Sequence, residues 1–210
     1  MVQLYDDLWQ TKLEIPFAGV HTHAYFLKCP DGNVLIYNTS HKDDIHHMVE
    51  LGGIKYQFLS HRDEAGKSLK SIKEEFNSEL CCHIKEEPII ARSCPVDVTF
   101  SEHTSHFCSI EVIPTPGHTS GSISFFYHSP KGQNYLFTGD TLFQSNGHWG
   151  TIVFPGAGGS IEALIDSLKI YRELNPDVVI SSASPGDISI VEITHDQWKV
   201  DIDNKIQELK

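Results

Sequence analysis

Imidazole and carboxylate side chains follow three apolar runs of the sequence, each in a short polar loop. His61 with Asp63, then His118, then Asp140 occupy these loops. The loops span residues 58–66, 113–122 and 135–143. Short apolar runs bounded by turn residues predict buried strands, so each group is expected at a strand end. Because His and carboxylate groups are ligands of zinc and iron, we predict that His61, His118 and Asp140 face one cavity and hold a metal ion.

Two imidazoles and one carboxylate around an open face suit a single ion. Such a set is typical of Fe(II), and with Zn(II) it leaves a coordination position for water. Asp63 is a fourth ligand or a general base beside the ion, and its alternative is a surface turn residue next to Arg62 or Glu64. For His61 and His118 the alternative is a hydrogen-bonded histidine of the core. The predicted cofactor is one divalent ion, zinc or iron.

Further imidazole and aromatic groups are candidates for substrate contact. His21 and His23 alternate with other residues in a predicted strand near the expected mouth of the cavity. His148 and Trp149 lie in the loop after Asp140, which is expected to overhang the cavity. We predict substrate contacts from His23, His148 and Trp149.

Composition and charge restrict the class of protein. The chain has 210 residues and a formal net charge of −12 without a basic stripe, so general nucleic-acid binding is not expected. No segment approaches the roughly 18 apolar residues of a membrane span, and the N-terminal segment lacks the positive charge of a signal peptide. The cysteines have no C-x-x-C spacing and are expected to be reduced and mostly buried: Cys29, Cys81, Cys82, Cys94 and Cys108. We expect a cytosolic protein that acts on a small molecule and binds no membrane, and an oligomer is compatible with this composition.

Hydrophobic periodicity predicts two groups of elements. The runs Gly19–Lys28 and Asn33–Asn38 flank a Pro-Asp-Gly turn and predict a hairpin, and Ser40 is expected to cap the next helix. Further helices are predicted over 67–77, 161–173 and 196–209, and further strands over 55–60, 80–83, 106–114, 122–128, 134–138 and 178–180. Early strands alternate with helices, whereas the middle strands follow one another through short turns. This order predicts an α/β protein with a four-layer αββα sandwich, formed by one domain over residues 1–210.

Two sequence segments resemble motifs of the metallo-β-lactamase superfamily, especially its glyoxalase II-like hydrolases. Residues 115–122, Thr-Pro-Gly-His-Thr-Ser-Gly-Ser, are similar to T-P-G-H-T-x-G-S, and residues 137–143, Phe-Thr-Gly-Asp-Thr-Leu-Phe, to F-T-G-D-x-L-F. The resemblance covers nearly the whole chain. It implies the αββα fold, with His118 and Asp140 as metal ligands.

The sequence departs from the family pattern at the ligands of a second ion. The family's H-x-H-x-D-H loop corresponds to residues 61–66, where only the first His is present. Asp63 takes the second His position, Ala65 the Asp position and Gly66 the last His position, while Ala183 replaces a later His ligand. Asn38 stands where the family often has an Asp. The resemblance therefore implies at most one ion, or none if the site is degenerate.

Three functions are compatible with this pattern. The first is a metal-dependent hydrolase in which His61, His118 and Asp140 hold the ion, and its bound water attacks a thioester, lactone or phosphoester. The second is a mononuclear iron oxygenase of a small sulfur compound, since the persulfide dioxygenase branch of the family resembles this ligand set. The third is a non-catalytic member of the family that binds a small molecule or a protein through the former active-site cleft. Metal content separates the first two.

Overall fold

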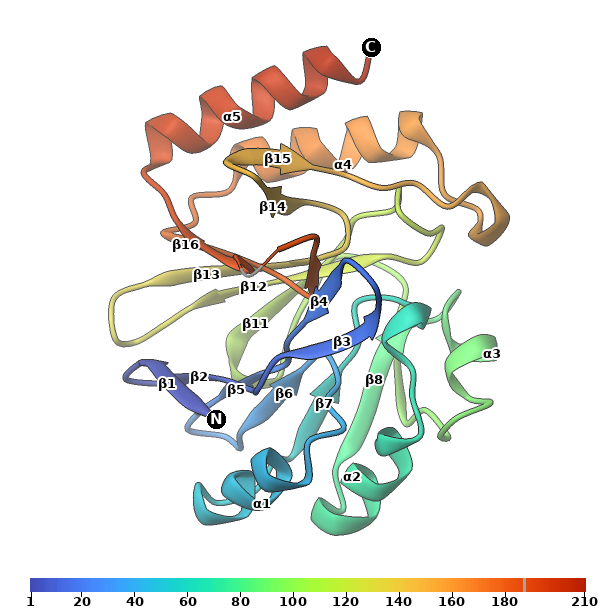
Figure 1. The fold of residues 1–210 in the computed structure, drawn as a ribbon, viewed down its shortest axis with the longest axis vertical. Helices are drawn as coiled ribbons and strands as arrows, with labels where there is room; N and C mark the ends of the chain where they lie inside the picture. The colour runs from blue at the N-terminus through green and yellow to red at the C-terminus, as the bar shows by residue number, and fades with distance from the viewer. Residues whose placement is uncertain (187) are drawn as a thin grey trace.

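Two β-sheets pack face to face, and helices cover the outer face of each (Figure 1). The computed structural model describes residues 1–186 and 188–210, and the side chains of His106 and Cys108 lie outside this description. The strand order is β1-β2-β5-β6-β7-β8-β9 in the first sheet and β10-β11-β12-β13-β16-β18 in the second. The predicted four-layer αββα sandwich is confirmed.

The first sheet is antiparallel at its start and parallel from β6 to β9. Its strands are β1 (Val2–Tyr5), β2 (Leu8–Gln10), β5 (Tyr25–Leu27), β6 (Val34–Ile36), β7 (Tyr56–Phe58), β8 (Glu79–His83) and β9 (Val98–Phe100). The helices between the parallel strands are α1 (Lys42–Glu50), α2 (Ser68–Phe76) and α3 (Glu87–Ile90). Because parallel strands need crossover connections, these helices return the chain to the same edge and leave the loops after β7 and β8 at one end.

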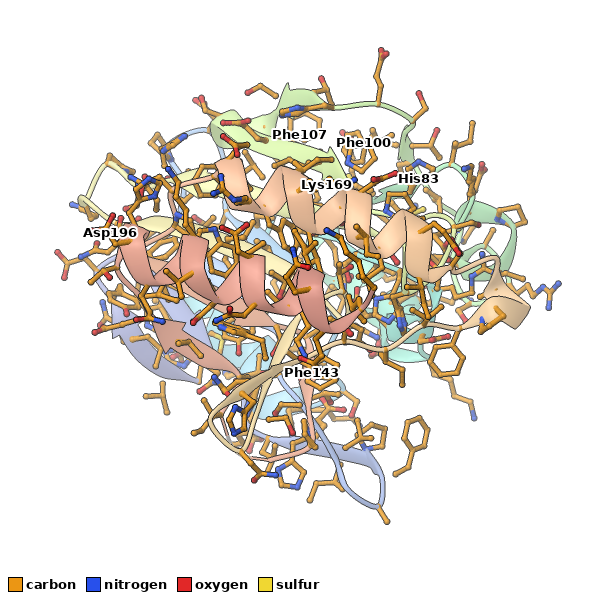
Figure 2. All side chains as sticks on the ribbon, turned by 90° about the horizontal axis from the view of Figure 1, so that it is seen from above. His83, Phe100, Phe107, Phe143, Lys169 and Asp196 are labelled. Carbon is orange, nitrogen blue, oxygen red and sulfur yellow. The ribbon has the colours of Figure 1, made fainter. Side chains whose placement is uncertain are left out.

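The second sheet is antiparallel except where β13 pairs in parallel with β16. Its strands are β10 (Thr104–His106), β11 (Ile110–Pro114), β12 (Ile123–His128), β13 (Asn134–Gly139), β16 (Val178–Ser181) and β18 (Ile190–Glu192). Helix α4 (Ile161–Glu173) connects β13 to β16 after an excursion, and α5 (His195–Glu208) ends the described chain. Figure 2 shows the two helices side by side above this sheet, with Lys169 on α4 and Asp196 on α5.

Aromatic side chains fill the space between the sheets. Tyr25, Tyr37, Phe58, Phe125 and Phe137 are almost fully buried and contact one another edge-on or tilted. Such packing between two apolar faces holds the sheets at a fixed separation. The strand ends that carry the candidate ligands are therefore attached to a rigid frame.

Two local predictions for the first third of the chain need correction. The hairpin of β5 and β6 is confirmed, but Gly19–Lys28 is not one strand. β4 (Val20–Thr22) leaves the first sheet and pairs with β3 (Glu14–Phe17) and β17 (Ala183–Ser184) in a separate small sheet. Ser40 does not cap α1, because its hydroxyl donates to Glu14 and the cap position belongs to His41, whose side chain makes no capping bond.

The remaining expectations concern cysteines and membrane spans. Cys29, Cys81, Cys82 and Cys94 are buried free thiols, while the side chain of Cys108 lies outside the described part. No helix within the described residues is long and apolar enough to cross a bilayer. A ribbon missed at the sequence level, β14 (Phe143–Ser145) with β15 (His148–Gly150), follows Asp140 and reaches toward α5 (Figure 1).

Candidate metal centre

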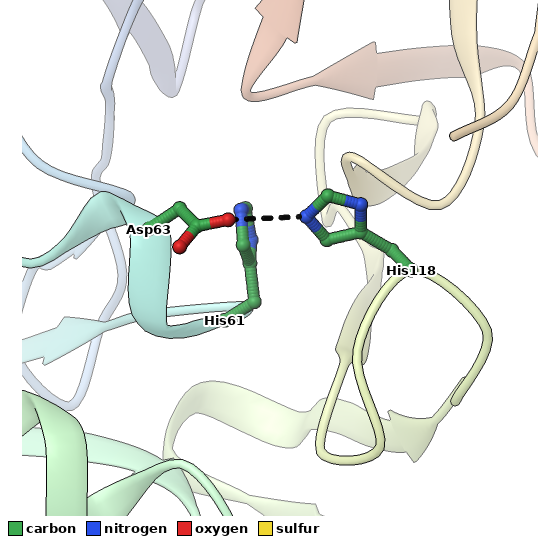
Figure 3. Close-up of side chains that lie close together, drawn as sticks. All are labelled: His61, Asp63 and His118. Carbon is green, nitrogen blue, oxygen red and sulfur yellow. Dashed lines mark ion pairs between the residues drawn. The ribbon is translucent and has the colours of Figure 1, made fainter. Parts of the chain in front are cut away.

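The three predicted loops converge at one end of the sandwich. His61 and Asp63 follow β7, with Asp63 in the short 3-10 turn Arg62–Glu64, His118 lies between β11 and β12, and Asp140 follows β13. His118 Nε2 lies 3.5 Å from Asp63 Oδ2 and 3.8 Å from Asp140 Oδ2, and His61 Nε2 lies 3.3 Å from Asp140 Oδ2. The rings of His61 and His118 are perpendicular, with centroids 4.6 Å apart (Figure 3).

His118 presents a lone pair to the centre of this group. Its Nδ1 lies 3.1 Å from the carbonyl oxygen of Ile152, and since a carbonyl can only accept, Nδ1 carries the proton and donates it. Nε2 is then an acceptor, and it is buried without a hydrogen-bond partner. A buried acceptor with no donor in reach is costly unless a cation lies there.

His61 is oriented by a relay through Ser60 to Glu64. Glu64 has only 7% of its side chain exposed and accepts a short hydrogen bond from the Ser60 hydroxyl. Because the hydroxyl proton of Ser60 is donated to Glu64, Ser60 Oγ accepts a hydrogen bond from His61 Nδ1, 2.9 Å away. Nε2 of His61 is therefore also directed as an acceptor toward Asp140. Gly139 has a positive φ of 56°, and a Cβ there would collide with Ser60, so glycine is required where the two loops meet.

Acceptor atoms from His61, Asp63, His118 and Asp140 thus face one another. Such an arrangement is stable only around positive charge, either a proton or a metal ion. Within the described part of the chain, His61, Asp63 and His118 are the group of potential ligands whose donor atoms all lie within 4.8 Å of one another. The residues fit a divalent ion, with Asp140 as an added ligand.

The protonation of the metal-free protein agrees with a site that requires positive charge at its centre. Burial works to lower the pKa of His61, but the negative charges of Asp140 and Glu64 outweigh it and hold that pKa well above its ordinary value. Burial works to raise the pKa of Asp140, but the charges of His61 and His118 and a hydrogen bond from Ser182 hold it well below its ordinary value. Without a metal, a proton on His61 supplies the positive charge between the two carboxylates.

Hydrogen bonds fix Asp140 and its backbone. Ser182 Oγ donates to Asp140 Oδ1 at 2.7 Å, which leaves Oδ2 to face both histidines. The hydroxyl of Tyr37 accepts from Gly139 N at 2.9 Å and donates to the Ile180 carbonyl at 3.0 Å. Tyr37 therefore bridges β13 and β16 at the point where their register shifts, immediately before Asp140.

A buried ion pair joins the two histidine loops. Glu86, fully buried at the start of α3, accepts from Arg62 Nε at 2.5 Å and from Arg62 Nη2 at 3.0 Å. Glu86 Oε1 also accepts from Thr119 Oγ1 at 2.9 Å. Because Arg62 follows His61 and Thr119 follows His118, Glu86 fixes the distance between the two imidazoles.

A cavity of about 300 Å³ opens beside the ligand group. His61, Asp63 and Asp140 form one side of it, and the small residues Ala65, Gly66 and Ala183 contribute to its wall; it is the space in which the family pattern has further ligands. The β3–β4 hairpin contributes Pro16, Phe17 and Val20 to its lining. Because these three residues are small, the cavity has room for a small molecule beside the candidate ligands.

The candidate substrate residues separate into two groups. His23 lines the cavity, and its Nδ1 lies 2.8 Å from the carbonyl of Thr11. His148 and Trp149 do not line it. Trp149 is buried, donates from Nε1 to Asp201 at 2.8 Å and packs edge-on against Trp198, and His148 is exposed beside it. The β14–β15 ribbon folds toward α5 instead of over the ligands.

Several residues that organise the site were not found from the sequence: Ser60, Glu64, Glu86, Tyr37 and Ser182. From the sequence, Glu64 is only a neighbour of Asp63 in a surface turn. Its one sequence signal is the four-residue spacing from Ser60, which allows the side chain to return to Ser60 N at 2.8 Å across a 3-10 turn. Glu86 and Tyr37 lie far along the chain from their partners and give no local signal.

Comparisons with known proteins agree with the fold and the motifs. The family model described as the metallo-beta-lactamase superfamily matches residues 46–183. A hydroxyacylglutathione hydrolase of Pectobacterium atrosepticum is 34% identical over 109 residues, which cover 50% of this chain and 36% of that protein. The hydroxyacylglutathione hydrolase GloC of Haemophilus influenzae is 41% identical over 73 residues, which cover 34% of this chain and 31% of that protein. The chain thus spans about a third of the length of the curated relatives it matches.

Solved structures share the fold at low sequence identity. A metallo-beta-lactamase from Pontibacter korlensis has a TM-score of 0.73 at 16% identity, with 99% of this chain and 97% of that chain covered. A metallo-beta-lactamase from Cronobacter sakazakii has a TM-score of 0.61 at 16% identity, with 82% of this chain and 81% of that chain covered. The latter is described by a HARLDQ motif. These likenesses concern the fold alone.

Proposed function

This chain belongs to the metallo-beta-lactamase superfamily, and from that premise we propose that it is a hydrolase that uses one divalent metal ion to cleave an ester-like bond. The observation that carries the proposal is the convergence of two imidazole Nε2 atoms and two carboxylates, with Nε2 of His118 buried and without a hydrogen-bond partner. The enzyme acts on a small molecule in the cytosol and forms a single domain over residues 1–210.

Each ligand has a distinct part in the proposed reaction. A divalent ion held by these residues would supply Lewis acidity that lowers the pKa of an attacking water into the neutral range. His61, His118 and Asp140 are buried or nearly so and are held in position by hydrogen bonds: each histidine donates from Nδ1 to a neighbouring oxygen, and Asp140 accepts from Ser182. Asp63 is 56% exposed and belongs to the ligand group, so its carboxylate is placed to accept the proton of the attacking water and release it to solvent.

The ester-like bond is a thioester, a lactone or a phosphoester. The similarity to hydroxyacylglutathione hydrolases supports the thioester among these. The test uses protein freed of metal with a chelator and then loaded with zinc or with iron. We expect hydrolysis of at least one of the three bond types only in the loaded protein. Equal turnover by metal-free and loaded protein would contradict the proposal.

A mononuclear iron oxygenase is the second candidate function. The set of two histidines with a carboxylate, observed here as His61, His118 and Asp140, is typical of iron centres with open positions. Oxygen uptake by the iron-loaded protein in the presence of a small persulfide would favour this function. Zinc-supported hydrolysis without oxygen uptake would favour the first.

A binding protein without catalysis is the third candidate. The vacated positions at Ala65, Gly66 and Ala183 form a cavity, and a cavity can bind a ligand without turning it over. Absence of turnover with either metal, together with saturable binding of a small molecule, would favour it.

A further inference from the structure

The cavity beside the ligands contains four carboxylates, and each has an identified partner. Asp63 and Asp140 face the imidazoles and the position of the ion. Glu64 accepts from Ser60 N and from the Ser60 hydroxyl. Glu14 accepts from Thr39 Oγ1 at 2.7 Å and from Ser40 N at 2.6 Å. None of these negative charges is therefore left to select a ligand by itself.

Lys67 differs from these groups because its charge has no such partner. It follows Ala65 and Gly66 and lines the cavity with them. Among the described residues that line the cavity it is the one lysine or arginine, and no ion pair between described residues involves it. Lys67 is exposed at the N-cap position of α2, directly after the positions where the family pattern has ligands of a second cation. An ammonium group at the rim of a cavity attracts an anionic substituent.

We propose that this cavity receives the carboxylate end of a short acyl group, paired with Lys67, while the bond to be cleaved lies at the ion. The substrate class is then an ester-type compound of a small dicarboxylic acid. The volume of about 300 Å³ restricts the acyl group to a short one. The net charge of −12 does not prevent binding, because charges farther than about 8 Å away are screened at physiological salt. This inference rests on the proposed hydrolase function.

The test compares two thioesters of the same thiol that differ in one charge, a succinyl and a butyryl ester, with the metal-loaded protein. We expect the wild type to have the higher kcat/KM for the succinyl ester. Lys67→Gln should lower that value by roughly tenfold and leave the butyryl value unchanged, because only the charge pair is lost. Lys67→Arg should restore most of the preference.

Lys70→Gln is the matched control, since Lys70 lies in the first turn of α2, close to Lys67 in the chain, is 70% exposed and pairs with Glu74 outside the cavity. It should leave both values unchanged. A wild type that prefers the butyryl ester, or a Lys67→Gln variant that loses both activities equally, would overturn the assignment of Lys67.

Binding of free succinate and butyrate separates this inference from the hydrolase proposal. If neither thioester is hydrolysed but succinate binds the loaded wild type more tightly than Lys67→Gln, the hydrolase proposal fails and the cavity assignment stands. If both thioesters are hydrolysed without preference and succinate binds wild type and variant equally, the cavity assignment fails and the hydrolase proposal stands.

Discussion

Asp140 touches both histidines through one carboxylate oxygen, so it is the residue on which metal binding depends most directly. Asp140→Asn preserves the volume but removes the charge that offsets a divalent cation. We expect metal affinity to fall by more than the roughly 10- to 100-fold that loss of an outer hydrogen-bond partner costs, with activity lost in parallel. Calorimetric titration of metal-free protein measures this, and Asp166→Asn on the exposed face of α4 is the control. Equal affinity of wild type and Asp140→Asn would end the metal-enzyme hypothesis.

Asp140 and His61 together make the site sensitive to pH. The pKa of Asp140 is lowered on folding, so its contribution to stability is present above the unfolded value near 3.9 and is lost as pH falls. The pKa of His61 is raised, so its contribution is present below the unfolded value near 6.5 and is lost as pH rises through the folded value. Since a metal ion must displace the His61 proton, the affinity for the metal should rise with pH. Binding of each ion should release about one proton. Titrations in buffers of different ionisation enthalpy measure this release, and a pH-independent affinity would contradict it.

The relay from Glu64 through Ser60 to His61 provides a residue-scale test of positioning. Glu64→Gln and Ser60→Ala should each lower metal affinity by roughly 10- to 100-fold, because the imidazole loses the partner that fixes its tautomer. In the cobalt-loaded protein the visible spectrum should change, which a merely less stable fold would not produce. Glu75→Gln, on the exposed side of α2, serves as the control and should bind metal as the wild type does. Unchanged affinity in both relay variants would assign Ser60 and Glu64 a purely structural role.

At the scale of elements, Glu86 connects the turn after β7 to the loop between β11 and β12, and thereby one sheet to the other. Removing one charge from a buried pair leaves the other uncompensated. Glu86→Gln should therefore reduce the free energy of unfolding by about 3 kcal/mol and weaken metal binding as the two imidazoles move apart. Urea denaturation of the metal-free protein checks the first effect. The neighbouring Glu87→Gln should change neither quantity, and equal effects from both variants would show that Glu86 has no special part.

The elements that were predictable from sequence are those with a local cause. Helices 161–173 and 196–209 follow from apolar periodicity and appear within a residue of the predicted bounds. His61, His118 and Asp140 were predictable because each lies in the short loop that follows a strand, and because glycines shape the loops around them. The split of Gly19–Lys28 into β4 and β5 was not predictable, since both pieces are β-rich and only pairing with β17 separates them. The course of β14–β15 depends on Trp149 packing against Trp198 on α5, a contact with no signal in the loop itself.

For the whole molecule, the number of ions per chain is the quantity that distinguishes a reduced site from a complete one. Among the residues that the structure describes, one set of potential ligands comes together, and Ala65, Gly66 and Ala183 have no side-chain ligand atoms in the adjacent cavity. Protein purified without added metal should therefore carry at most one tightly bound ion, as measured by elemental analysis. Two tightly bound ions would show that other residues complete a second site.

The prediction of one ion per chain can also be tested by restoring the family's missing ligand residues. Gly66 has an ordinary backbone, and a Cβ there would lie 3.2 Å from Asn38 Nδ2, so a side chain fits after a small shift. Ala65 and Ala183 already line the cavity. The combined variant Ala65→Asp, Gly66→His, Ala183→His should thus bind a second ion, because two imidazoles and a carboxylate then face the space beside Asp140. The added side chains and ion fill the cavity, so the preference for a succinyl over a butyryl ester should disappear in the same variant. A variant that folds, keeps one ion and retains the preference would place the family's second-ion position elsewhere than in this cavity.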